Sequence, residues 1–120
     1  MAYDTDLAAR LRDLLAGPLP IAEKEMFGGL AFMMDGHMFV GIIGDQLMVR
    51  VGPDQHAAAL AQPHVRPMDF SGRPMRGYVY VAADGLIEDA ALRSWCELAL
   101  QFVGTLPPKA AAKRSAKSSA

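Results

Sequence analysis

The sequence predicts an α+β fold, a two-layer sandwich in which a mainly antiparallel β-meander sheet carries an N-terminal and a C-terminal helix on one face. Two patterns predict it. Apolar residues recur at helical spacing near both ends of the chain, and short apolar runs separated by glycine-rich turns fill the region between them. With 120 residues, 52% of them hydrophobic, the chain has the size of one domain and enough apolar material for a core.

A helix is expected at each end of the body. The first follows an N-cap at Asp4 or Thr5 and stops at Gly17 and Pro18, and the last spans about 89–105. Their apolar stripes consist of Leu7, Leu11, Leu14 and Leu15 in the first, and of Leu92, Trp95, Cys96, Ala99, Phe102 and Val103 in the last.

Between the helices the pattern predicts five strands and a short helix. The strands lie near residues 22–27, 30–34, 38–43, 46–51 and 77–82, and the short helix near 52–60. Because Pro63, Pro67 and Pro74 interrupt the segment 62–76, we expect it to be mostly irregular, with at most a brief edge strand over 65–68.

The central hairpin is apolar at both alternating positions, so two helices on one face leave its other side without a cover. The two sets are Phe32, Met34, Met38, Val40 and Ile42 against Ala31, Met33, Phe39 and Ile43. The second face has three candidate covers: the chain's own segment 63–76, the second subunit of a homodimer, or a protein partner.

Charge divides the chain into a domain over residues 1–108 and a basic tail over 109–120. The domain has eight Lys and Arg against thirteen Asp and Glu, a net charge of −5, whereas the tail has four cations and no acid: Lys109, Lys113, Arg114 and Lys117. Lacking large apolar residues, the tail is expected to be disordered. It is either a solubilising terminus or a weak, sequence-independent contact to nucleic acid.

No pattern predicts catalysis, a metal or a cofactor. Cys96 lies in a helical apolar stripe, where a thiol is a core residue rather than a nucleophile, and three scattered histidines lack the spacing of a zinc site. An N-terminus without an apolar leader, a lone cysteine and no membrane-spanning run predict a cytoplasmic protein without a disulfide.

Four arginines cluster in and beside the proline-rich segment: Arg50, Arg66, Arg73 and Arg76. In one interpretation their guanidinium groups bind phosphate, a carboxylate ligand or an acidic partner surface. In the other they pair with Asp45, Asp54 or Asp69 and hold the segment in place.

Three segments in this order resemble the N-terminal domain of the TfoX/Sxy family: MFGGLAFMMDG from Met26, LMVRVGP from Leu47, and RPMDFSGRPMRGYVY from Arg66. The similarity covers about residues 3–108. It implies an α+β fold that works by protein interaction, without catalytic residues. Two-domain members are associated with positive regulation of natural competence genes alongside the cyclic-AMP receptor protein, whereas this sequence has only the basic tail after Pro108.

We therefore expect a non-enzymatic protein-interaction module, a transcription-linked accessory protein resembling competence regulators. Its partner is expected to be a protein, such as part of the transcription machinery, or a second copy of the chain on the sheet face. The alternative is a small anionic-ligand-binding protein or enzyme with an arginine-lined pocket under residues 63–77.

Overall fold

The computed structural model describes residues 3–17, 20–26, 28–70 and 73–106, and of residues 69–70 and 73–75 it describes the backbone only. The tail 109–120, with its expected disorder and its four cations, lies outside these residues. The elements in chain order are α1 (Thr5–Leu15), β1 (Ile21–Met26), β2 (Gly29–Met34), β3 (His37–Ile43), β4 (Gln46–Arg50), the 3₁₀ turn η1 (Pro53–Gln55), α2 (His56–Leu60), β5 (Val65–Phe70), β6 (Arg73–Val81), the 3₁₀ turn η2 (Ala83–Leu86) and α3 (Asp89–Val103).

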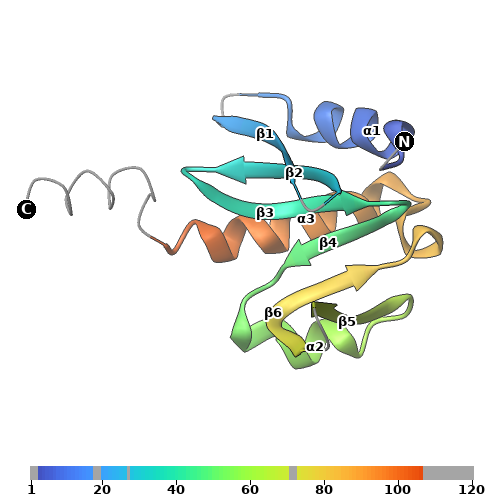
Figure 1. The fold of residues 1–120 in the computed structure, drawn as a ribbon, viewed down its shortest axis with the longest axis vertical. Helices are drawn as coiled ribbons and strands as arrows, with labels where there is room; N and C mark the ends of the chain where they lie inside the picture. Colours follow the sequence, from blue (N-terminus) through green and yellow to red (C-terminus); the bar gives the residue numbers. More distant parts are fainter. Residues whose placement is uncertain (1–2, 18–19, 27, 71–72, 107–120) are drawn as a thin grey trace, which may run out of the picture.

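The fold is α+β, as the sequence predicts. Six antiparallel strands form one sheet in the order β1-β2-β3-β4-β6-β5. Strands β1 to β4 form a meander, and the β5–β6 hairpin extends the sheet through the pairing of β6 with β4. Strands β1 and β5 are therefore its two edges. In Figure 1 α3 runs behind the sheet, across β3 and β4.

The prediction of a mostly irregular segment over 62–76 is wrong. This stretch forms β5 and the first part of β6, which pair as an antiparallel hairpin. Two positions explain why proline is tolerated. Pro67 lies on an edge strand, which has a free side, and Pro74 lies in the part of β6 that extends past β4, whose last partner is Tyr78. The segment extends the sheet, so it does not cover the sheet's second face.

A β-bulge in the β2–β3 hairpin changes which side chains share a face. Phe32 pairs with Val40, but its neighbour Met33 pairs with Met38, so Phe39 is the extra residue. The alternation predicted from sequence is wrong at this point. Phe39 is fully buried in the core with Phe32 and Val40, while Met38 joins Met33 on the opposite face.

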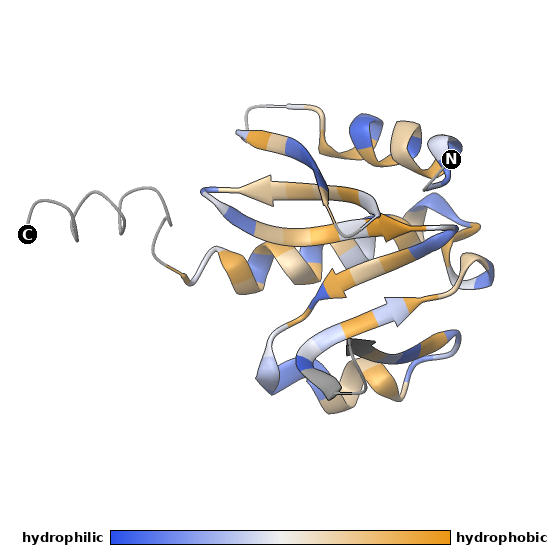
Figure 2. Ribbon diagram, in the orientation of Figure 1, coloured by the Kyte–Doolittle hydropathy of each residue, from blue (hydrophilic) through white to orange (hydrophobic). Residues whose placement is uncertain are grey.

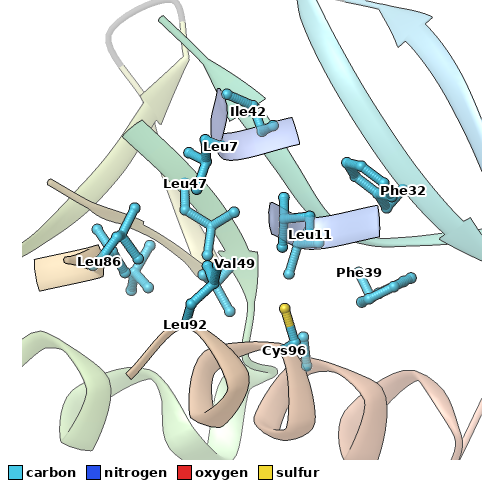
Figure 3. Close-up of a cluster of buried hydrophobic side chains, with 14 of the residues drawn as sticks. Leu7, Leu11, Phe32, Phe39, Ile42, Leu47, Val49, Leu86, Leu92 and Cys96 are labelled. Carbon is cyan, nitrogen blue, oxygen red and sulfur yellow. The ribbon is translucent and has the colours of Figure 1, made fainter. Parts of the chain in front are cut away.

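One apolar core joins the helices to a single face of the sheet. It contains Leu7 and Leu11 from α1 together with Leu92 and Cys96 from α3. Figure 3 shows these side chains meeting those of the strands, with the Cys96 sulfur pointing into the cluster. Asp4 caps α1 as expected, because its carboxylate accepts hydrogen bonds from the backbone N–H groups of Asp6 and Leu7 at 2.9 and 3.2 Å.

Candidate functional site

The face of the sheet turned away from the helices, here called the open face, is the candidate site. Directly paired residues of neighbouring strands share a face, so the pairing defines it. One row crosses all six strands and consists of Lys24, Ala31, Gly41, Met48, Tyr80 and Arg66. In the orientation of Figure 1, no helix of the described chain lies in front of the sheet.

The open face has a methionine side and an arginine side. On β1–β3 it carries half-buried apolar side chains, with Met33 and Met38 paired across the hairpin and Ile43 further along β3. On β4, β6 and β5 it carries Arg50, Tyr78, Tyr80 and Arg66. Between the two sides Met48 is fully buried, yet it does not belong to the helix-facing core cluster.

Charge on the open face contrasts with the acidic character of the domain. The strand positions that the pairing and alternation place there are Ala22, Lys24, Met26, Gly29, Ala31, Met33, Met38, Gly41, Ile43, Gln46, Met48, Arg50, Arg66, Tyr78 and Tyr80. They include three cations and, among these described positions, no Asp or Glu. The carboxylates of β1, Glu23 and Glu25, alternate onto the helix-facing side.

Arg66 lies flat on the open face. Its Cζ is 4.7 Å from the centre of the Tyr80 ring, within cation–π range. Its Nε and Nη2 donate hydrogen bonds to Gln46 Oε1 at 3.1 and 2.5 Å. Two neighbouring strands thus fix the orientation of an exposed guanidinium group without neutralising its charge.

Arg50 is held at the other end of the arginine side by two rings. Its Cζ lies 5.6 Å from the centre of Tyr78 and 5.4 Å from the centre of Phe102, which belongs to α3. Gly52 makes this approach of α3 achievable, because a Cβ atom on Gly52 would overlap the Phe102 ring. Arg50 therefore links the open face to the C-terminal end of α3.

The other two arginines of the sequence cluster lie on β6. Arg76 is exposed and forms no hydrogen bond, ion pair or ring contact with the residues that the structure describes. The side chain of Arg73 is outside the described set. Pairing with Asp45 or Asp54 is not observed for Arg50, Arg66 or Arg76, and the Asp69 side chain is also outside that set.

By contrast, two arginines on the helical side are neutralised. Arg10 Nη2 lies 3.0 Å from Asp89 Oδ1, and Arg12 Nε lies 2.7 Å from Glu23 Oε2. These pairs tie α1 to α3 and to β1. The open-face arginines Arg50 and Arg66 stack on aromatic rings instead, which leaves their charge available to a partner.

Two groups with catalytic potential, Cys96 and His56, have structural roles. Burial raises the pKa of Cys96 to about 12, so the thiol stays protonated at neutral pH. His56 Nδ1 accepts a hydrogen bond at 2.8 Å from the backbone N–H of Gly77, a residue of β6 with a φ of 90°. Within the described residues no three His, Cys, Asp or Glu side chains gather as a metal site.

Two hollows lined by described residues lie near the sheet and the helices, and neither gathers several arginines. A hollow of about 360 Å³ beside Arg66 also has Asp45 and Asp84 in its wall, so its charge does not favour an anion. Another, of about 320 Å³, lies between α2 and α3 next to Trp95 and has no charged residue in its lining. The alternative of an arginine-lined pocket under residues 63–77 stays a prediction, because the side chains of residues 69–75, Arg73 among them, lie outside the described set.

Comparison with known families identifies the domain. The family model described as the TfoX N-terminal domain matches residues 13–103. The chain belongs to this family. No curated protein and no solved structure matches it.

The TfoX N-terminal domain assignment supports a competence-related regulatory or accessory role as the broad class of function. The match covers α3 up to its last residue, Val103, and the sheet that carries the open face. None of the helices in the described ranges has the length and apolar content needed to cross a membrane.

Sequence reasoning selected the arginines of this TfoX domain but missed the tyrosines on which they stack. The signal was the alternation Tyr78-Val79-Tyr80, which puts both rings on one face of a strand and Val79 in the core. That face also receives Arg50 and Arg66 through the strand pairing.

Proposed function

We propose that the protein is a non-enzymatic interaction module, an accessory to transcription regulation, and that the methionine side of the open face is where it docks a partner protein. The observation that carries the proposal is an unpartnered sheet face on which Met33, Met38 and Ile43 are half-buried in the domain itself. Methionine side chains adapt their shape to a contact surface, which suits regulatory docking.

Binding of a partner is supported by the composition of the whole face. Apolar residues on the methionine side supply the hydrophobic area of a protein interface, and the arginine and tyrosine of the other side are residue types enriched in such interfaces. A binding role rather than a catalytic one is supported by the structural roles of Cys96, a buried thiol, and of His56, which accepts a hydrogen bond from Gly77. We place the function in the cytoplasm, with the transcription machinery as the source of the partner.

The test is affinity capture from nuclease-treated extract of the native cells, followed by binding of the purified candidate. Full-length wild type is compared with the double variant Met33→Glu/Met38→Glu. Charged groups at the centre of the interface would lower the affinity by at least about tenfold. Ile87→Glu is the matched control, because Ile87 is 72% exposed and lies outside the sheet.

A partner retained equally by the wild type and both variants would refute docking on the methionine side. Sedimentation of the same proteins tests the homodimer. If the wild type is a dimer and Met33→Glu/Met38→Glu is a monomer, the partner on this face is a second copy of the chain, and the accessory role must use another surface.

A further inference from the structure

We propose that a groove on the helical side of the domain binds an amphipathic helix of another protein, with an apolar stripe and a lysine or arginine at each end of it. This site goes beyond the docking proposed for the open face. The groove, here called the α2–α3 groove, consists of a hollow of about 320 Å³ between α2 and α3 and one of about 270 Å³ between η1 and α3. The two hollows are adjacent, because Gln55 and Leu98 line both.

The first argument is the shape of the α2–α3 groove. On the α3 wall Trp95, Leu98 and Phe102 are spaced i, i+3 and i+7, and all three are half-buried. The α2 wall has small side chains such as Ala58, which let a further helix come within the 8–10 Å at which helices pack. From Ala91 to Phe102 the lining follows α3 for about 16 Å, or about three turns.

The second argument is charge complementarity. Asp54 lines the groove beside Phe102, and Glu88, the residue before α3, lies about one helical turn from Ala91 at the other end. Neither carboxylate forms an ion pair with the described part of the chain. No lysine or arginine is among the residues that line the two hollows. An apolar groove with an acid near each end fits an apolar helix with a cation near each end.

The third argument is that this chain does not supply such a helix itself. The tail 109–120 has no large apolar residue to fill the groove. Among the described residues the exposed large hydrophobic side chain is Ile87, which lies outside the helices. A second copy of the domain therefore has no apolar helical stripe to offer. A helix of another protein, with apolar anchors at i, i+3 or i+4 and i+7, is the occupant that the groove fits.

The test uses Trp95, the single tryptophan of the chain, as a reporter inside the groove. The probe is a tryptophan-free synthetic peptide of about 16 residues, held helical by a side-chain bridge, with a leucine stripe and lysine at both ends. A second peptide has glutamate in place of each lysine. Titration of the full-length protein with the lysine peptide should shift the Trp95 emission to shorter wavelength, because leucine replaces water around the ring. The glutamate peptide should bind at least about tenfold more weakly.

Matched variants locate the binding. Ala58→Arg puts a long cationic side chain into the groove and should lower the affinity for the lysine peptide by at least about tenfold. Ala57→Arg is the control, because Ala57 is exposed on the same helix but lines neither hollow. Asp54→Asn should weaken binding by about threefold, whereas Asp45→Asn, in the turn between β3 and β4, should not. Thermal unfolding of each variant checks that the domain remains folded.

Several results would overturn the proposal. They are an unchanged Trp95 emission, equal affinities of Ala58→Arg and Ala57→Arg, and tighter binding of the glutamate peptide. Self-association of the wild type that Ala58→Arg abolishes would make a second copy the occupant. A gain in peptide affinity of at least about tenfold on deletion of 109–120 would make the tail the occupant.

The open-face proposal is tested independently. Met33→Glu/Met38→Glu changes the other side of the sheet and should leave the affinity for the lysine peptide unchanged. Loss of a captured partner in that variant and loss of peptide binding in Ala58→Arg are therefore separate results, and either proposal can fail while the other stands.

Discussion

Arg12 on α1 and Glu23 on β1 form a two-bond ion pair, with Nε 2.7 Å from Oε2 and Nη2 2.8 Å from Oε1. The pair connects the first helix to an edge strand of the sheet. The hydrogen bond from Arg12 holds the pKa of Glu23 below its ordinary value of 4.5. Both side chains are partly exposed, so the pair makes a small, salt-sensitive contribution to stability.

Glu23→Gln is therefore expected to lower the unfolding midpoint slightly at neutral pH. Because the folded-state pKa is lowered, the stabilisation is fully present above pH 4.5 and is lost as the pH falls through that lowered value. The difference between wild type and Glu23→Gln should disappear at about pH 2. Denaturant unfolding across this range measures it, with Glu25→Gln on the same strand as control. A gap that persists in acid would contradict the assignment.

Cys96 is expected to be inert in the native protein. The side chain is 2% exposed and its pKa is raised to about 12 by burial, so little thiolate forms at pH 8. The reaction with Ellman's reagent should be slow without denaturant and complete in a single fast phase in concentrated urea. Rapid stoichiometric reaction of the folded protein would show that the last helix does not bury this thiol.

Gly52→Ala tests the contact between α3 and the chain that leads from β4 to η1. Gly52 has a φ of 86°, and a Cβ atom there would overlap the Phe102 ring. Backbone strain and overpacking together should lower the free energy of unfolding by about 2–4 kcal/mol. Gly44→Ala is the control, because Gly44 also has a positive φ, of 60°, but has nothing within 4 Å of the added atom. Its cost should be only about 1–2 kcal/mol. Equal losses in the two variants would refute the packing argument.

The β-bulge is tested by comparing neighbours on β3. Phe39→Ala removes a fully buried ring from the core and should cost about 3–5 kcal/mol in urea denaturation. Met38→Ala changes a half-buried side chain on the open face and should cost less than about 1.5 kcal/mol. The reverse ranking would mean that the strand keeps regular alternation and that Met38 faces the helices.

Helices and hairpins with local signals were predictable from the sequence. Asp4 as a helix cap predicted the start of the first helix to within one residue. The apolar stripe that contains Cys96 predicted the last helix. The turn at Asp35 and Gly36 has the positive φ values that its Asp-Gly pair favours. These features depend on residues close in sequence, so a local pattern records them.

Features that depend on distant residues were not predictable. The three prolines of residues 62–76 made a strand unexpected there. Pro67 is tolerated because it lies on the edge strand β5, and which strand forms an edge depends on the order of strands in the sheet. Likewise, whether Arg66 pairs with an acid or stacks on Tyr80 depends on which strand lies beside β5. The composition of the candidate site was visible in the sequence, and its arrangement was set by the tertiary fold.

Both borders of the sheet oppose the addition of a further strand. On β1 the run Glu23-Lys24-Glu25, the blue segment of that strand in Figure 2, makes an incoming chain bury charges. On β5 Pro67 lacks the N–H that a new neighbour would need. Growth by edge-to-edge polymerisation is thus discouraged at each end, so association of this protein with itself or with other macromolecules should proceed by stacking onto its broad surface.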